Sequence, residues 1–401
     1  MPTHPHSDLD RDRLALRDTV RAFAQSRLAP AVAPNENGDG QLSKHAFTGL
    51  VRGMHALGLP AMLVPASYGG GGGGLMDAVL ALEELGAVDA GFAASIGLTM
   101  TVPAFIQAAG SAKQLASLLP QLADDPEFLL AGALNEPSVA GAELFDPQPA
   151  SDRGITTRAE ADGDGYVLNG AKAPWVTNAG VAAAYIVFAR TDPDLPPISG
   201  TSAFWVPAGT TGLMVGPRTR LLGLHGGWHA NVVLDNARVP HEALIGPKGD
   251  GLRLLQSTTP GMAVGLAAVF VGVARAAQDA SVAFTSQRRS WGASLRSHQA
   301  VALDLADMAI SVRTARLMVH DAARAIDSGA PPAELAVCVP AAKTHAVDAA
   351  IANAQRAVRL HGATGVTVGA GPEKLLRDAW TGYSCDFTGA MLRLSISSAL
   401  S

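Results

Sequence analysis

Two groups of residues in this sequence have side chains that could do chemistry together. Cys385 stands beside Asp386, and a thiol next to a carboxylate would suit nucleophilic catalysis. In such a place a cysteine is more often a small residue that lines a pocket or packs in the core. His225, His229 and His241 would suit a metal, but no metal-ligand spacing occurs among the 11 histidines. We therefore predict neither a thiol nucleophile nor a metal site.

The composition excludes several classes of protein. The chain has 401 residues, of which 48% are hydrophobic and 16% are charged, which is typical of a folded protein of two or three domains. Its net charge is -5 and its basic residues do not cluster, so neither nucleic acid nor an anionic membrane is the expected main partner. The low fraction of charged residues favours a homo-oligomer that hides apolar surface.

The cysteines, the start of the chain and its longest apolar stretch indicate the cellular compartment in which the protein works. Two cysteines make no disulfide framework, which favours a reducing environment. The polar start of the chain lacks the apolar core of a signal peptide. The longest apolar stretch, residues 262–277, is interrupted by Gly265, Gly272 and Arg275 and predicts a buried helix instead of a membrane span. We expect a cytoplasmic protein.

The periodicity of apolar residues changes twice along the chain. Residues 1–126 have helical periodicity, and Ser43 could cap a second helix. Residues 127–246 alternate with period two, and the run DGDG at 162–165 predicts a hairpin between strands at 156–161 and 166–169. Residues 247–401 return to helix, with long segments near 262–287, 298–327, 334–361 and 372–400. No G-x-G-x-x-G run follows a strand, which excludes a Rossmann fold.

Several stretches, in order, resemble the acyl-CoA dehydrogenase family. The resemblance covers the chain from about Leu14 to Leu394. It rests on residues 166–172 (YVLNGAK) with 175–178 (WVTN), 239–240 (VP) with 244–246 (LIG), 288–292 (RRSWG), Gln299 with 305–308 (LADM), 359–365 (RLHGATG) and 373–379 (EKLLRDA).

The resemblance implies an α+β architecture in three domains. These are an N-terminal α-helical domain (1–126), a central antiparallel β-barrel or sandwich domain (127–246) and a C-terminal four-helix bundle (247–401). FAD would lie between the β-domain and the bundle, and a neighbouring subunit of a homotetramer or homodimer would hold part of it.

The family desaturates acyl thioesters, and a carboxylate there removes the α-proton while the flavin accepts a hydride. Counting on from residues 377–379 (RDA), the resemblance places Asp386 at the position of the base, where the family has glutamate. An aspartate is one methylene shorter, so the backbone or the substrate must shift to restore contact. In an apolar flavin pocket its pKa would be raised by desolvation.

The resemblance also assigns the residues that contact FAD and substrate. Thr177 would bond the flavin, Trp175 would pack beside its ring, and Arg288 would pair with the diphosphate. The remaining expected FAD contacts are Leu134, Trp291, Gln299, Arg359, Gly362 and Thr388, with Trp291 and Gln299 reaching across a subunit interface. The expected substrate contacts are Phe387, Ala142 and Trp228.

Departures from the family pattern bear on the substrate. The loop 135–143 (NEPSVAGAE) has one extra residue, and the stretch 223–229 (GLHGGWH) replaces groups that usually hold CoA. Phe387 stands where the family has glycine and would narrow the pocket. These changes favour a short or unusual acyl group, carried on CoA or on an acyl carrier protein, with electrons passing to an electron-transfer flavoprotein or a similar acceptor.

Two alternatives remain open at this point. The first is a flavin oxidase or monooxygenase on the same fold, because nitroalkane oxidases resemble this family and have an aspartate as base. The second is a degenerate, non-catalytic scaffold that binds no flavin.

Overall fold

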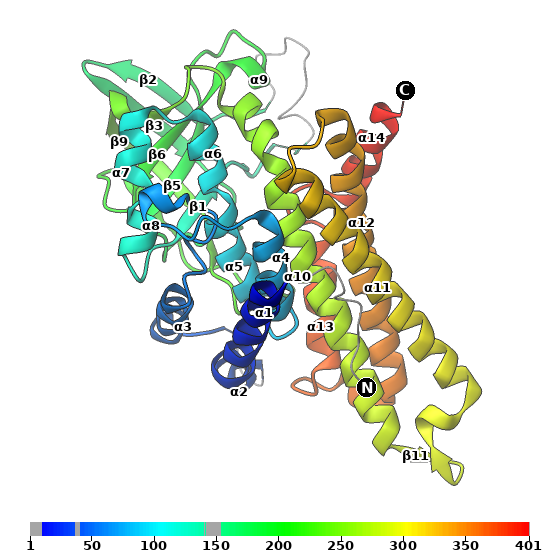
Figure 1. The fold of residues 1–401 in the computed structure, drawn as a ribbon. Helices are drawn as coiled ribbons and strands as arrows, with labels where there is room; N and C mark the ends of the chain where they lie inside the picture. Colours follow the sequence, from blue (N-terminus) through cyan, green and yellow to red (C-terminus); the bar gives the residue numbers. More distant parts are fainter. Residues whose placement is uncertain (1–9, 37–40, 140, 142–153, 401) are drawn as a thin grey trace.

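A computed structural model describes residues 10–36, 41–139, 141 and 154–400, and the predicted substrate contact Ala142 lies outside these residues. A group of N-terminal helices packs between a β-sheet and a bundle of long helices (Figure 1). The long helix α10 (Gly251–Gln287) contacts all three parts, since it packs against α4 and α5, against β6 and against α11 and α12. The helix–strand–helix order expected from the sequence is confirmed.

The N-terminal part is helical throughout. Helix α1 (Arg11–Phe23) continues through a π-helical turn (Ala24–Leu28) into α2 (Ala29–Glu36), and the predicted apolar face buries Val20. Ser43 caps α3 as predicted, because its hydroxyl accepts a hydrogen bond of 3.2 Å from the amide of Ala46. The other helices here are α3 (Lys44–Ala56), α4 (Leu75–Gly86), α5 (Ala90–Thr101), α6 (Pro103–Ala109), α7 (Ala112–Leu118) and α8 (Gln121–Asp124).

The central part is an eight-stranded sheet in the order β10-β6-β5-β2-β3-β9-β7, with β1 also paired to β5. The predicted hairpin is confirmed: Asp162 pairs with Gly165, and Gly163 takes a positive φ of 61° in the turn. The strands are β1 (Leu130–Ala133), β2 (Arg158–Asp162), β3 (Gly165–Ala171), β5 (Ala184–Arg190), β6 (Thr201–Pro207), β7 (Leu213–Val215), β9 (Val232–Pro240) and β10 (Leu244–Ile245), with a short helix α9 (Pro197–Gly200) before β6.

The sheet differs from the expected antiparallel arrangement around β5, which pairs in parallel with both β1 and β2. In the longer of these two pairings β1 lies along β5, with Leu130 opposite Ala184. Both strands are buried, and a strand buried on both faces has no alternation to recognise in the sequence. Two separate ribbons lie outside this sheet, formed by β4 (Val176–Thr177) with β8 (His229–Ala230) and by β11 (Arg289–Ser290) with β12 (Ala293–Ser294).

The C-terminal part is a bundle of α10 with α11 (Gln299–Asp327), α12 (Pro332–His361) and α13 (Pro372–Gly382). The prediction of one continuous segment over 372–400 is wrong, because the chain breaks at residues 383–388 and resumes as α14 (Gly389–Ala399). Asp386 has a φ of 47° there, which no α-helix accepts, and Thr388 caps the new helix by accepting from the amide of Met391.

Within the part of the chain that the structure describes, three helical segments are long and apolar enough to cross a membrane by length and composition: Ala90–Ala109, Gly251–Gln287 and Pro332–Val366. In the protein, 61%, 67% and 50% of their most apolar windows are buried against other elements. The stretch 262–277, predicted to be a buried helix, lies in the middle of α10 and contributes Val264, Val269 and Phe270 to the core. Its apolar character is therefore explained by packing.

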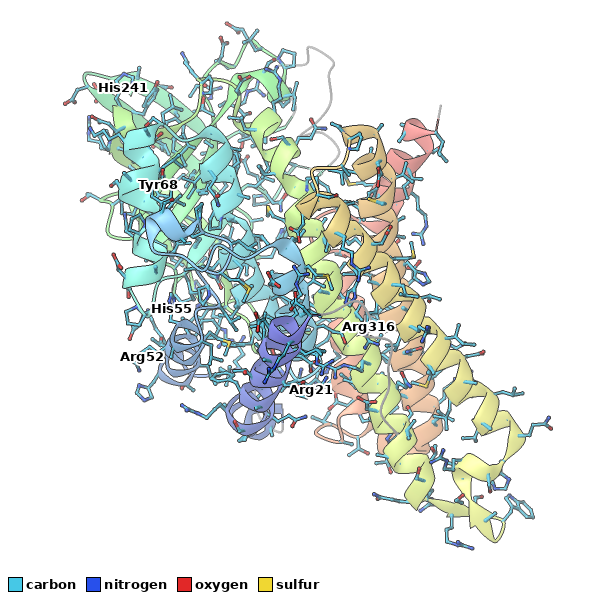
Figure 2. The ribbon with its side chains drawn as sticks, viewed as in Figure 1. Arg21, Arg52, His55, Tyr68, His241 and Arg316 are labelled. Carbon is cyan, nitrogen blue, oxygen red and sulfur yellow. The ribbon has the colours of Figure 1, made fainter. Side chains whose placement is uncertain are left out.

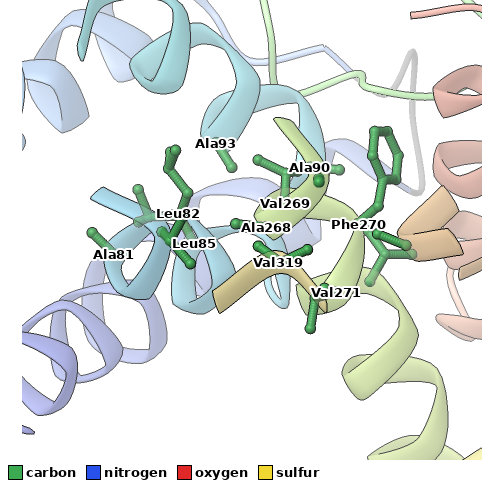
Figure 3. Packing of buried hydrophobic residues seen from close by; sticks show 14 of the residues in the cluster. Ala81, Leu82, Leu85, Ala90, Ala93, Ala268, Val269, Phe270, Val271 and Val319 are labelled. Carbon is green, nitrogen blue, oxygen red and sulfur yellow. The ribbon is translucent and has the colours of Figure 1, made fainter. Parts of the chain in front are cut away.

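Helices α4 and α10 pack closely, and Figure 3 shows buried side chains of both, such as Leu82 and Val269, in one apolar cluster. Each helix has a glycine at the crossing. A Cβ added to Gly86 would lie 2.4 Å from the carbonyl oxygen of Val269, and one added to Gly272 would lie 2.4 Å from that of Glu83. Both contacts are with backbone, which cannot rotate away. The crossing therefore requires glycine on both helices.

We expect Gly272→Ala to lower the free energy of unfolding by about 3 kcal/mol, because the methyl group would force α4 and α10 apart. Thermal or urea unfolding measures the loss. Gly261→Ala is the matched control, since it lies on the same helix with nothing within 4 Å of its added Cβ. That variant should be neutral or gain about 0.5–1 kcal/mol from helix propensity. Equal stabilities for the two variants would contradict the close approach.

Charged groups also join the N-terminal helices to the bundle. Glu83 and Glu84 on α4 are buried and pair with arginines from both sides: Arg316 bonds Glu83 at 2.7 Å, and Arg21 bonds Glu84 at 2.8 Å (Figure 2). Burial raises the pKa of Glu83, but Arg316 and then Arg275 outweigh it and bring it to about 2. The carboxylate therefore remains charged between the two domains.

The start of α4 depends on the last residue of α11. Asp327, the last residue of α11, accepts hydrogen bonds from the amides of Leu75 (2.7 Å) and Met76 (3.0 Å). A carboxylate at this place accepts hydrogen bonds from two amides that have no partner within the helix. Its negative charge also interacts favourably with the positive end of the helix dipole.

Candidate active site

Asp386 lies in the loop 383–388, between α13 and α14, which we call the base loop. Its side chain is exposed to solvent in the single chain, yet enough protein surrounds it that desolvation raises its pKa, against a smaller opposite effect of the Lys343 ammonium. Behind the loop, a hollow lined by Lys343, Val347, Tyr383, Phe387 and Leu392 has a volume of about 10 Å³. That is room for about one water, so the loop is packed closely against the bundle.

A loop from the sheet domain, residues 221–228, packs on α13. The amide of Gly223 donates to the Thr381 hydroxyl (2.8 Å), and the amide of Leu224 donates to Asp378 (2.6 Å). Asp378 also binds the Lys374 ammonium at 2.6 Å, and this ammonium is shared with a second buried carboxylate, that of Asp89, at 3.0 Å. This loop therefore fixes the sheet domain to the helix that leads into the base loop.

Trp228 is at the other end of this loop and packs toward α3. Its ring meets Phe47 edge-on at 5.9 Å, and the Arg218 guanidinium lies 4.3 Å above it. Arg218 also donates to the carbonyl oxygens of His225 and Gly227, so the arginine and the indole hold the loop together. The structure gives Trp228 a packing role, and its predicted contact with substrate stays a prediction.

The ribbon β4–β8 continues from this loop and carries one of the predicted flavin contacts, Thr177, which pairs with His229. Trp175, the second, lies in the turn just before β4 and is 47% exposed, while Val176 between the two is buried. Asn178 follows β4 with a φ of 66°, and its amide donates to the carbonyl oxygens of Ser95 and Leu130. The backbone next to Thr177 is thus held by Asn178, and the Trp175 ring is open to solvent.

A buried ion pair fixes the segment after β1. Lys172 bonds Glu136 at 2.8 Å, and both side chains are at most 1% exposed. Glu136 also accepts from the amides and hydroxyls of Thr156 and Thr157. The Lys172 ammonium donates further to the carbonyl oxygens of Leu134 (3.3 Å) and Phe188 (2.7 Å).

Gly141 lies close to α14, the helix that follows the base loop. A Cβ added to Gly141 would lie 3.7 Å from the sulfur of Met391, in the first turn of that helix, which Thr388 caps. Leu134, the residue after β1, is half-buried against the apolar cluster that includes Phe128 and Trp205.

The other predicted FAD contacts lie at the far end of the bundle. β11, which carries the turn with Trp291, is at the end of the long helices remote from the sheet (Figure 1). His361 stacks on Phe284 at 4.2 Å and so brings the end of α12, with Gly362, beside the end of α10. Arg288, Trp291, Gln299, Arg359 and Gly362 are all exposed there. The structure thus divides the predicted contacts into two groups within one chain.

Comparison with known proteins identifies the chain. Three family models match in order: the N-terminal domain of acyl-CoA dehydrogenase at residues 10–125, its middle domain at 133–237 and its C-terminal domain at 249–400. An acyl-CoA dehydrogenase of Bacillus subtilis is 33% identical over 97% of this chain and 98% of its own length. The chain belongs to the acyl-CoA dehydrogenase family.

Solved structures agree with this assignment. The butyryl-CoA dehydrogenase of Megasphaera elsdenii superposes with a TM-score of 0.89 and 29% identity, covering all of both chains. A chain from a structure titled for the electron transferring flavoprotein of Acidaminococcus fermentans gives a TM-score of 0.89 and 30% identity over 98% of each chain. This acyl-CoA dehydrogenase is accordingly an FAD-dependent oxidoreductase that acts on CH–CH groups.

The exposed residues of this acyl-CoA dehydrogenase have the chemistry that FAD needs. Trp291 is 95% exposed, and the Arg288 guanidinium has no carboxylate partner among the described residues. An aromatic surface and an unpaired cation suit the adenine and the diphosphate of a dinucleotide. Gly362 has a φ of 59° and open space where a Cβ would stand, so backbone can approach a ligand there.

Sequence analysis passed over Lys343, which lies beside the base loop. Lys343 falls on the same face of α12 as Val339, Val347 and Ala350, which are buried. A single lysine on the apolar face of a helix was the feature that could have revealed it, because such a charge needs a partner inside the protein.

Proposed function

We propose that this acyl-CoA dehydrogenase desaturates a short or unusual acyl thioester with Asp386 as the base that removes the α-proton. The observation that supports this most is the base loop. Its left-handed turn carries a carboxyl group with a raised pKa at the family position of the base, shortly after helix α13, which the loop 221–228 joins to the sheet domain. A carboxylate with a raised pKa is better matched to proton abstraction near neutral pH.

We assign the predicted site residues separate roles in catalysis, FAD binding and substrate binding. Bound FAD supplies the acceptor for the hydride that leaves the β-carbon. Asp386 takes the α-proton on a carboxylate oxygen, and Trp175 and Thr177 would contact the flavin ring. Arg288, Trp291, Gln299, Arg359 and Gly362 would hold the adenosine and diphosphate end. Leu134 and Thr388 would flank the flavin, while Phe387 would limit the acyl group.

The two groups of FAD contacts support a homotetramer or homodimer. Within one chain the contacts at β11 lie far from the sheet, so we propose that they complete the site of a neighbouring subunit. We further propose that the protein is cytoplasmic and passes electrons to an electron-transfer flavoprotein. The carrier of the acyl group is CoA or an acyl carrier protein.

The visible spectrum of the purified protein tests this function. We expect a yellow protein whose flavin band bleaches when one member of a panel of short and branched acyl-CoAs is added without oxygen. If the CoA esters do not bleach the band but the same acyl group on an acyl carrier protein does, the substrate is carried on an acyl carrier protein. A band that no thioester bleaches would contradict the proposal.

Oxygen consumption distinguishes the proposed dehydrogenase from the second candidate function, a flavin oxidase or monooxygenase. The aspartate in place of glutamate favours this candidate, because nitroalkane oxidases on this fold have the same residue at the base. A dehydrogenase should turn over with an artificial electron acceptor and consume little oxygen. Rapid oxygen uptake that depends on the substrate would contradict the dehydrogenase function and support the oxidase or monooxygenase.

A further inference from the structure

One ammonium group holds both peptides that flank Asp386. Lys343 lies in the middle of α12 with 1% of its side chain exposed. Its Nζ donates a hydrogen bond of 2.6 Å to the carbonyl oxygen of Phe387 and another to the carbonyl oxygen of Cys385. Hydrogen bonds from a charged donor are shorter and stronger than neutral ones. Lys343 thus binds the base loop on both sides of the carboxylate without bonding the carboxylate itself.

The backbone that Lys343 binds is in an unfavourable conformation. Asp386 has a φ of 47°, in the left-handed region that residues with a Cβ seldom adopt. Such a conformation persists only where surrounding contacts hold it. The carbonyl oxygens of Cys385 and Phe387 can both accept from the Lys343 ammonium because the turn at Asp386 is left-handed. The direction of the Asp386 side chain from α13 follows from the same turn.

Lys343 also supplies the charge that acts on the base. The other charged groups that α12 and α14 bring to this region are Asp348 and Arg393, which pair with each other at 2.5 Å and are about half exposed. From the base loop itself, burial raises the pKa of the Cys385 thiol to about 12, so this thiol stays neutral. Among the described residues, the Lys343 ammonium is therefore the group whose charge opposes the desolvation of Asp386.

We infer that Lys343 is a positioning residue for the base: it holds the left-handed turn of the base loop and favours the ionised form of Asp386. The inference rests on the proposed function, in which Asp386 removes the α-proton. It predicts two separable effects of losing the ammonium. The carboxylate loses its direction, which slows proton removal, and it loses a nearby positive charge, which makes it harder to ionise.

Lys343→Met tests both effects in the intact FAD-loaded protein. We expect the variant to bind FAD and to reduce it about 10- to 100-fold more slowly with the acyl-CoA that bleaches the wild type. The midpoint of the rate against pH should rise by about one unit, because the carboxylate no longer has a cation beside it. Stopped-flow reduction without oxygen from pH 5.5 to about 9.5 gives both numbers, and thermal unfolding reports stability separately.

The control is Arg393→Met, which removes a positive charge from the neighbouring helix without touching the base loop. Its rate and its pH midpoint should match those of the wild type. If Lys343→Met is less stable but reduces FAD with the wild-type rate and midpoint, Lys343 is only structural and the inference is wrong. If Lys343→Met does not fold, Lys343→Gln takes its place, because it keeps a neutral hydrogen-bond donor. The same rate and pH midpoint then test the inference. A wild-type protein that no acyl thioester reduces overturns the proposed function and this inference together.

Discussion

Asp386→Asn should yield a folded, yellow protein whose flavin is reduced about 10²- to 10⁴-fold more slowly than that of the wild type. The amide is nearly isosteric with the carboxyl group but cannot accept the α-proton. FAD content should not fall, because the base loop is held through the carbonyl oxygens of Cys385 and Phe387 and not through the Asp386 side chain. Anaerobic stopped-flow reduction with an excess of acyl-CoA measures the rate.

The pH dependence of the wild type provides a second check on the same residue. Asp386 must be ionised to act, so the rate should rise with pH through the pKa of the folded protein. Desolvation raises that pKa, and Lys343 only partly opposes the rise, so the midpoint should lie above the ordinary aspartate value of 3.8.

Asp348→Asn is the matched control for this experiment, because it neutralises a half-exposed carboxylate on α12 that pairs with Arg393. It should leave the rate unchanged. Asp386→Glu restores a carboxylate at the family's usual length and should recover part of the rate. If Asp386→Asn keeps the full rate of reduction, the base lies elsewhere.

Glu136→Gln should lower the free energy of unfolding by about 3 kcal/mol at pH 6, because it leaves the Lys172 ammonium buried without a counter-charge. Burial raises the pKa of Glu136, but Lys172 and the hydroxyls of Thr156 and Thr157 outweigh it and bring it from 4.5 to about 2. A depressed pKa contributes stability that is present above pH 4.5 and is lost as the pH falls toward 2. The difference between wild type and variant should therefore shrink in that window.

The double variant Glu136→Gln with Lys172→Met separates the pair from its neighbours. Removing both charges should restore part of the stability, since no buried charge is left without a partner. The measurement stays below pH 7, because burial brings the pKa of Lys172 to about 8 and the ammonium must be charged throughout. A double variant no more stable than Glu136→Gln would show that the ion pair is not the source of the effect.

Much of the fold could be predicted from the sequence because its patterns are local. The hairpin at 162–165, the Ser43 cap and the long apolar helices each follow from residues close in the chain. β1 could not, since its partner β5 lies more than 50 residues away and both are buried on all sides. The break at 383–388 was also missed, because residues on either side of it continue a helical pattern.

The residues of the candidate site were proposed from the family resemblance, which says nothing of how this chain packs around them. The resemblance assigned Asp386, Thr177 and Arg288, yet it could not tell that Trp228 packs against Phe47. Nor could it show what Lys343 binds: a lone lysine on an apolar helix face indicates a buried ammonium, but its hydrogen bonds go to backbone carbonyls, whose positions no sequence pattern encodes.

The cap of α4 has a consequence for the order in which this protein is made. Asp327 follows Leu75 by 252 residues, so a ribosome releases the start of α4 long before the carboxylate that completes it. Glu83 of the same helix must likewise wait for Arg275 and Arg316. Until the bundle emerges, α4 has two unpaired amides and a carboxylate without its counter-charges. The nascent chain therefore cannot settle domain by domain from its beginning, and it reaches its final stability only when synthesis is nearly finished.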